Sequence, residues 1–126
     1  MNLGDLASWE LTMVSVGETS MVVALADDSG ERAQGLMGVG DLGQVDGMLF
    51  VFPEEGPGGF WMKDTLLHLD IAFFTSEGEL VEVLTMEPCP ADPCPLYVPA
   101  GEFRFALEVP AGRFESLPDD ATLAIP

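Results

Sequence analysis

Short apolar segments separated by turn-forming residues follow one another along almost the whole chain, and this succession constrains the fold most. Several segments alternate apolar with polar residues, and others are continuous runs of β-branched and aromatic residues. Alternation with a period of two is typical of strands that bury one face, and continuous apolar runs are typical of strands buried on both. We therefore expect strands at residues 9–16, 19–26, 47–52, 60–65, 69–75, 79–86, 102–109 and 121–125.

One short helix is expected between the second and third of these strands. Asp28 or Ser29 can cap its N-terminus, and Glu31 falls in the first turn, where the helix dipole favours an acid. Gly38 and Gly40 end the helix after about Met37, because glycine is poor at continuing a helix and common just beyond its end.

The number and order of these segments predict the architecture. About eight short strands that follow one another directly pair most readily as antiparallel neighbours. With one or two short helices, they predict a mainly β (or α+β) fold, a small single-domain antiparallel barrel or rolled sheet. We expect residues 1–126 to form this domain, with residues 1–8 as a flexible N-terminal extension.

The chain is strongly acidic, with 22 Asp and Glu against four Lys and Arg and a net charge of −18. Because phosphate binding needs a basic patch, we expect no nucleic acid and no anionic membrane as partner. The acidic surface suits high salt or solubility, or else it collects cations. No apolar run reaches the roughly 18 residues of a membrane span, and the first residues do not resemble a signal peptide.

Cys89 and Cys94 lie in a proline-rich loop, Glu87-Pro-Cys-Pro-Ala-Asp-Pro-Cys-Pro95. We expect a structural disulfide between them, with free thiols or a redox pair as alternatives. A zinc site is not expected, because His68 is the only further ligand of that kind, and no cofactor motif is present. A disulfide implies an oxidising compartment, so we expect a periplasmic or secreted protein, with the cytoplasm as the alternative.

The run Gly59–Ile71 is unusual because it places charges among apolar and aromatic residues. In an extended chain Lys63 and Asp64 point to opposite faces, so they are not partners within the strand. A buried charge costs several kcal/mol unless it is paired or hydrogen-bonded. Lys63 should therefore reach a carboxylate or extend to water, and Asp70 should find donors among turn backbone N–H groups or at Arg32.

Three interpretations of these charges remain open: ion pairs that fix the strand order, a ligand groove near Trp61, or a catalytic role for Lys63. His68 is expected on the polar surface, because no Gly-x-Ser-x-Gly elbow or second metal ligand accompanies it. The methionines are expected to fill the core, and Met37, Met48 and Met62 are the three that could converge. The candidate ligand-binding residues are Arg32, Met48, Trp61, Lys63, Asp64 and Asp70.

Six blocks stand out along the chain: residues 31–37, 46–52, 60–65, 69–73, 88–95 and 106–112. They resemble an uncharacterised family called domain of unknown function 192, and the resemblance covers about residues 19–126. The resemblance implies a compact, mainly β domain often found in bacterial and archaeal proteins with an export signal, and it implies no activity or cofactor. The residues that match the pattern are Arg32, Gly35, Met37, Gly47, Met48, Phe60, Trp61, Met62, Lys63, Thr65 and Asp70.

Two positions depart from that resemblance. Gly38-Val39-Gly40 stands where the family usually has a basic residue, which weakens an anion-binding role. His68 stands where the family often has proline, which loosens the turn into the next strand.

Two functions from different classes follow from these observations. The first is a non-catalytic binding or structural module of the cell envelope, with a shallow ligand groove near Trp61. The alternative is a small hydrolase-like enzyme that uses Lys63, Asp64 and Asp70, which would require these three side chains to open into one cavity. The expected partner is a small ligand or an envelope component, and the expected oligomeric state is a monomer or a weak dimer.

Overall fold

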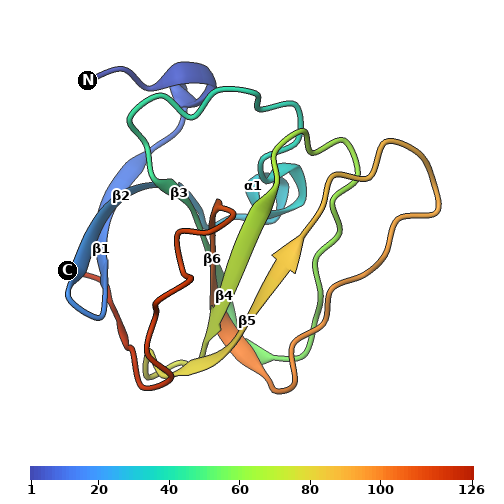
Figure 1. Ribbon diagram of the computed structural model, residues 1–126. Coiled ribbons are helices and arrows are strands. Elements are labelled where there is room, and N and C mark those ends of the chain that lie inside the picture. Colours follow the sequence, from blue (N-terminus) through green and yellow to red (C-terminus); the bar gives the residue numbers. More distant parts are fainter.

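Seven strands form one sheet in the order β5-β4-β6-β3-β2-β1-β7. In this computed structural model, which describes residues 1–126, the sheet curls into a half-barrel (Figure 1). The strands are β1 (Leu11–Val16), β2 (Thr19–Ala26), β3 (Gly47–Gly56), β4 (Leu69–Phe74), β5 (Leu80–Met86), β6 (Phe103–Pro110) and β7 (Leu123–Ala124). Neighbours are antiparallel except β2 and β3, whose parallel pairing requires the crossover that carries the short helix. The predicted mainly β rolled sheet is confirmed.

The curl brings the two edges of the sheet together at one point. An isolated antiparallel bridge joins Glu79, just before β5, to Thr122, just before β7. The backbone N–H of Leu123 donates to the carbonyl of Gly78 at 2.8 Å. Gly78 has a φ of +82°, and a side chain there would meet the backbone of Leu123, so the turn between β4 and β5 requires glycine.

Two expected elements differ from the structure. Residues 60–65 do not form a strand, because they bridge three separate segments in turn: Phe60 pairs with Tyr97, Lys63 with Cys89, and Thr65 with Met37. No single neighbour runs alongside them, so no ladder forms and the sheet has seven strands rather than eight. β3 also continues to Gly56, beyond the expected end of this strand at residue 52.

The helix α1 (Ser29–Gln34) is shorter than expected, since it ends before Met37. Asp28 caps it by accepting a hydrogen bond from the backbone N–H of Glu31 at 2.7 Å. Gly35 then adopts a φ of +49°, which only glycine adopts readily, and turns the chain away. No helix of the structure is long and apolar enough to cross a bilayer.

Apolar cores cover both faces of the central strands. One core takes side chains from every strand of the sheet and therefore fills the inside of the curl. The other core lies on the outer face, where the loop after α1 and the N-terminal segment cover it. Side chains alternate between the two along a strand, so Met48 and Phe50 face the outer core while Leu49 faces the inner one.

The N-terminal residues 1–8, which we expected to be a flexible extension, are tied to this outer core. They contain a 3₁₀ turn, Gly4–Leu6, and Leu6 is fully buried. The Asp5 carboxylate accepts hydrogen bonds from the backbone N–H groups of Gly40 and Asp41, both at 3.0 Å. Burial of Leu6 and these two bonds hold the segment against the loop that follows α1.

Asp70 is a buried carboxylate that joins three parts of the sheet. It lies on β4, is 6% exposed, and shares its face of the strand with Ala72 in the inner core. One oxygen accepts from the Thr85 hydroxyl on β5 and the other from the backbone N–H of Gly112 after β6, each at 2.8 Å. The donors include the turn backbone N–H that we expected, and Arg32 is not among them.

We expect Asp70→Ala to lower the free energy of unfolding by about 2–3 kcal/mol, because it leaves the Thr85 hydroxyl and the Gly112 N–H without an acceptor. Lys63→Met should change it by less than about 1 kcal/mol, since the Lys63–Asp92 ion pair is solvent-exposed. Urea unfolding of both variants tests this, and a larger loss in Lys63→Met would contradict it.

Candidate functional site

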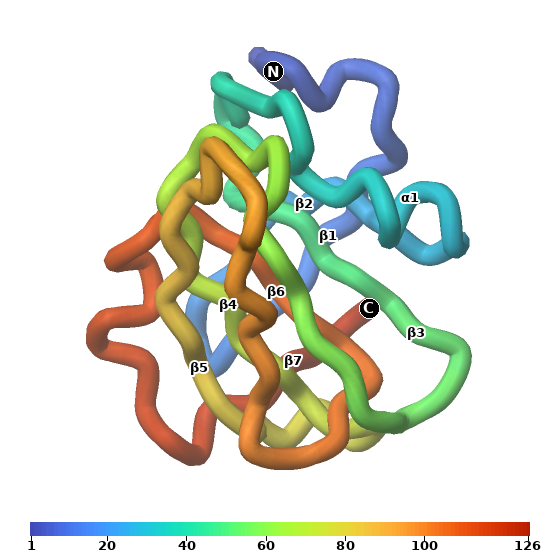
Figure 2. Tube along the Cα trace, turned by 90° about the vertical axis from the view of Figure 1, so that its right-hand side faces the viewer, coloured from blue at the N-terminus to red at the C-terminus, as the bar shows by residue number.

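A cavity of about 290 Å³ opens between α1, β3, β6 and the segment that carries Phe60 and Trp61. In Figure 2, α1 and β3 lie on the same side of the molecule, and both contribute residues to the lining of the cavity. We call it the aromatic cavity, because phenylalanine and tryptophan rings make up much of its wall. Its lining residues are Arg32, Ala33, Gln34, Gly35, Leu36, Met37, Phe50, Phe52, Gly59, Phe60, Trp61, Thr65 and Glu108.

Glu108 is a buried carboxyl group without a partner in the protein. It lies on β6 between Met48 of β3 and Ile71 of β4, and it is 4% exposed. No side-chain hydrogen bond or ion pair of the structure involves its carboxyl. Every side-chain nitrogen or oxygen that is fully shielded from solvent has a hydrogen-bond partner. The Glu108 oxygens have no partner, so they are not fully shielded and must reach the space of the cavity.

Burial raises the pKa of Glu108 from 4.5 to about 8, because loss of water disfavours the charged form. At pH 7 the group is therefore mostly a neutral carboxylic acid. In that state it can donate one hydrogen bond as well as accept, whereas the carboxylate can only accept.

Arg32 brings a cation to the same cavity from α1. Its Nη1 donates to the carbonyl of Val51 at 2.9 Å, and its guanidinium lies 5.2 Å from the centre of the Phe52 ring. The structure contains two ion pairs, Lys63–Asp92 and Arg113–Asp46, and Arg32 takes part in neither. In a chain with 22 acidic residues, a cation without a carboxylate partner has donors available for a ligand.

Aromatic rings pack edge to face behind the cavity. The Phe60 ring lies 5.0 Å from that of Phe50 and 6.2 Å from that of Phe52, both in T-shaped arrangements. Gly35 allows α1 to approach this cluster, since a Cβ there would lie 3.3 Å from the Phe50 ring. Trp61 is 47% exposed and stands at the mouth of the cavity.

The residues proposed from sequence are divided among different places. Arg32 and Trp61 line the aromatic cavity. Met48 is fully buried in the outer core, and Asp70 belongs to the opposite face of the sheet. Lys63 and Asp64 line a separate hollow of about 160 Å³ against the loop that contains the two cysteines.

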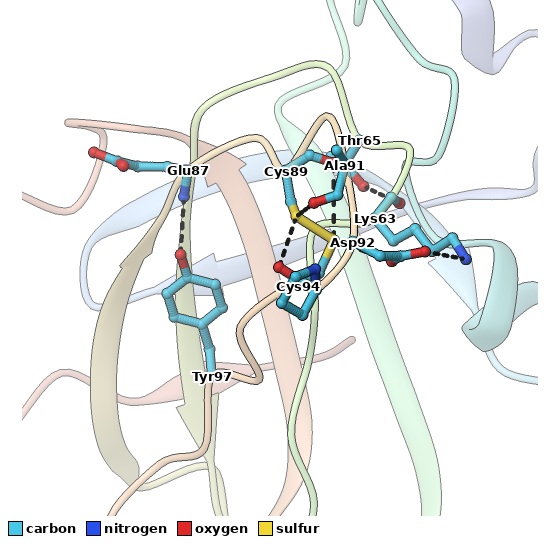
Figure 3. Close-up of a disulfide and its surroundings, with 9 residues drawn as sticks. Lys63, Thr65, Glu87, Cys89, Ala91, Asp92, Cys94 and Tyr97 are labelled. Carbon is cyan, nitrogen blue, oxygen red and sulfur yellow. Dashed lines mark hydrogen bonds and ion pairs between the residues drawn. A yellow bond between two sulfur atoms is a disulfide. The ribbon is translucent and has the colours of Figure 1, made fainter.

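Lys63 has partners on the surface near that loop (Figure 3). Its Nζ lies 3.6 Å from a carboxylate oxygen of Asp92 and 5.3 Å from the centre of the Trp61 ring. Its side chain is 40% exposed, so the ammonium reaches water as well as a carboxylate. Asp64 is exposed and has a φ of +58°, which places it at a turn.

The predicted disulfide between Cys89 and Cys94 is present, with Cα atoms 5.7 Å apart. The loop that it closes follows β5 and projects from the side of the molecule (Figure 1). Further along this loop, Tyr97 exchanges two backbone hydrogen bonds with Phe60, at 2.9 and 2.7 Å, and its hydroxyl accepts from the N–H of Glu87 (Figure 3). The loop therefore holds Phe60 in the cavity wall.

The other hollows and clusters are weaker candidates for a binding site. The largest hollow, about 430 Å³, lies between the β1–β2 turn and the C-terminal segment, and its one basic residue, Arg113, is paired with Asp46. Asp27, Asp28 and Glu31 could together approach a cation. Asp28 and Glu31 already accept hydrogen bonds from backbone N–H groups at the start of α1, which explains them as helix caps.

Sequence reasoning did not identify Glu108 as a site residue. The alternating run 102–109 assigned it to a strand and nothing more. The available signal was the block Ala106–Gly112, which resembles the family and in which Glu108 is the only charged residue. Burying a charge in such an apolar block costs free energy unless the charge has a partner.

Comparisons with known proteins place the chain in a family. The family model DUF192, described as "Uncharacterized ACR", matches residues 12–120, so the chain belongs to this family. A Sinorhizobium meliloti protein, provisionally named a transcription regulator, has a similar structure, with a TM-score of 0.82 and 27% identity over 91% of this chain and 93% of its own.

A protein of unknown function from Novosphingobium aromaticivorans is also similar, with a TM-score of 0.81 and 25% identity over 97% of this chain and 90% of its own. A comparison with curated proteins finds no match. Six of the eleven positions that match the family pattern line the aromatic cavity, among them Arg32, Phe60 and Trp61, and the other five lie elsewhere.

We expect the stability of the wild-type protein to fall as the pH rises from about 4.5 to 8, relative to Glu108→Gln. Below pH 4.5 the carboxyl is protonated in both the folded and the unfolded state. Between 4.5 and 8 only the unfolded state loses its proton, which favours unfolding. At about 1.4 kcal/mol per pKa unit, the rise in pKa from 4.5 to about 8 corresponds to a difference of about 5 kcal/mol.

Urea unfolding of both proteins at pH 5 and pH 8.5 measures this difference. Glu102→Gln, at an exposed position just before β6, is the control and should leave the pH dependence unchanged. A gap between wild type and Glu108→Gln that stays constant over this range would contradict the raised pKa.

Reduction of the Cys89–Cys94 disulfide is expected to lower the melting temperature. Closing so short a loop contributes about 2 kcal/mol by restricting the unfolded chain. Dithiothreitol should therefore destabilise the wild-type protein and have no effect on a variant with both Cys89→Ser and Cys94→Ser. An unchanged wild-type melt would argue against the stabilising role.

Proposed function

We propose that this DUF192 protein is a non-catalytic binding module of the cell envelope, whose small ligand enters the aromatic cavity beside Trp61. The observation that carries the proposal is the pair of unpartnered groups in one cavity, the buried carboxyl of Glu108 and the guanidinium of Arg32. A concave, mostly apolar site with a few convergent polar groups is the usual form of a small-molecule site.

The lining of the cavity favours binding over catalysis. It offers a carboxyl, a guanidinium, an amide and the Thr65 hydroxyl, and it contains no His, Cys or Lys. The Thr65 hydroxyl already donates to the carbonyl of Lys63 at 3.3 Å, so it makes no hydrogen bond to a base that would activate it as a nucleophile.

The residues of the alternative enzyme hypothesis do not share a cavity. Lys63 and Asp64 line the hollow at the disulfide loop, while Asp70 accepts two hydrogen bonds on the other face of the sheet. A shared cavity was the condition for that hypothesis, so the arrangement gives it little support.

A location in the cell envelope is supported by the disulfide, because such bonds persist in oxidising compartments. We propose a periplasmic or secreted protein for this reason. The large negative charge would keep its surface well solvated at high salt.

The name of the Sinorhizobium meliloti protein gives little reason to propose nucleic-acid binding for this chain. A net charge of −18 repels phosphate at long range. Two of the four basic residues are paired with carboxylates, and Arg104 donates its Nε–H to the carbonyl of Phe52 at 3.0 Å. No cluster of free cations is left to follow a phosphate backbone.

A thermal-shift screen of metals, sugars, amino acids and cell-wall fragments, at low and high salt, tests the proposal. Compounds that raise the melting temperature should also change the emission of Trp61 in Trp9→Phe, which leaves Trp61 as the only tryptophan. Trp61→Phe, which keeps Trp9, is the matched control and should show little change. Saturating compounds that leave Trp61 emission unaltered would place binding elsewhere and contradict the proposal.

A further inference from the structure

The two charge-bearing groups of the aromatic cavity are not paired with each other. A buried carboxyl group and a guanidinium normally associate as an ion pair, because each charge is costly to bury alone and the guanidinium keeps the carboxyl ionised. Glu108 and Arg32 line the same space, yet no ion pair within 4.0 Å joins them. The cavity therefore presents an acid and a cation at separate points, and each retains hydrogen-bonding capacity.

Flat apolar surfaces border the space in which these two groups lie. The rings of Phe50, Phe52, Phe60 and Trp61 all contribute to the lining. Such faces accommodate an apolar body, and they also attract a ligand cation. The volume of about 290 Å³ is just below the range for ligand pockets, about 300–1,000 Å³, which favours a small ligand of the size of an amino acid.

We infer that the ligand is a small zwitterion of the amino-acid type, whose cationic nitrogen binds Glu108 after the carboxyl releases its proton to solvent, and whose anionic group binds Arg32. An apolar side chain of this ligand packs against the aromatic wall. A ligand with only one charge would leave either the acid or the guanidinium as it is in the empty protein, whereas a zwitterion provides a partner for both. The inference rests on the proposed binding function.

Three probes of nearly the same shape separate the two charges. L-phenylalanine carries both, 2-phenylethylamine lacks the carboxylate, and 3-phenylpropionate lacks the ammonium group. Calorimetric titration of the wild-type protein at pH 7 should show that phenylalanine binds about tenfold or more tightly than either of the other two, since each lost charged hydrogen bond weakens binding by that order.

Two variants assign each charge to its partner. Glu108→Gln should weaken phenylalanine and 2-phenylethylamine by about tenfold and leave 3-phenylpropionate unchanged. Arg32→Met should weaken phenylalanine and 3-phenylpropionate and leave 2-phenylethylamine unchanged. Arg113→Met, which removes a cation outside the aromatic cavity, is the matched control and should affect none of the three.

If a probe with one charge binds as tightly as phenylalanine, or if none of the three binds, the inference is overturned. The proposed binding function is tested separately, by whether any compound of the screen changes the emission of Trp61. The comparison of probes in the wild-type protein needs no variant, so it decides the matter even if Arg32→Met does not fold. Melting curves of each variant show whether a lost affinity reflects a lost fold.

Discussion

The pairing of β6 with strands on both of its edges is the constraint on which the rest of the structure depends. β6 lies between β3 and β4, and apolar cores cover both of its faces. Gly47 allows this close approach, because a side chain there would overlap the backbone carbonyl of Glu108. Any polar side chain on this part of β6 therefore lies inside the protein, and Glu108 lies there.

The sheet contains two buried acids, and their partners distinguish their roles. Asp70 has a hydroxyl and a backbone N–H as donors, so its carboxylate is stabilised and joins β4 to β5 and to the turn after β6. Glu108 faces the opposite side, where aromatic and aliphatic side chains surround it and no donor reaches it. An acid with donors contributes to the fold, whereas one without donors weakens it and requires another reason to be present. A ligand in the aromatic cavity supplies that reason.

Local pattern predicted most strands because each has its own alternation or apolar run, and β1, β2 and β6 lie within a few residues of the expected limits. The segment 60–65 has the composition of a strand but no continuous neighbour, and neighbours are decided by the whole chain. Arg32 and Trp61 could be proposed as site residues because a cation and a large aromatic ring are conspicuous in sequence.

Glu108 could not be found in the same way. In the run 102–109 it alternates with Phe105, Leu107 and Val109, as a solvent-facing residue would. The outward face of β6 is buried because α1, the loop after it and residues 59–61 cover it. These covering segments come from distant parts of the chain. Alternation indicates which side of the strand Glu108 occupies, but it carries no information on what covers that side.

Glu108 has a carboxyl group that is buried without a partner and lines the aromatic cavity, and the rest of the account depends on this placement. The most direct measurement is a titration of the side-chain carboxyl carbons by ¹³C NMR, in protein labelled at glutamate, with Glu108→Gln used to assign the signal. The account predicts that the signal lost in Glu108→Gln titrates with a midpoint near 8. A midpoint near the ordinary value of 4.5 would contradict it, because the group would then be hydrated or already hydrogen-bonded within the protein.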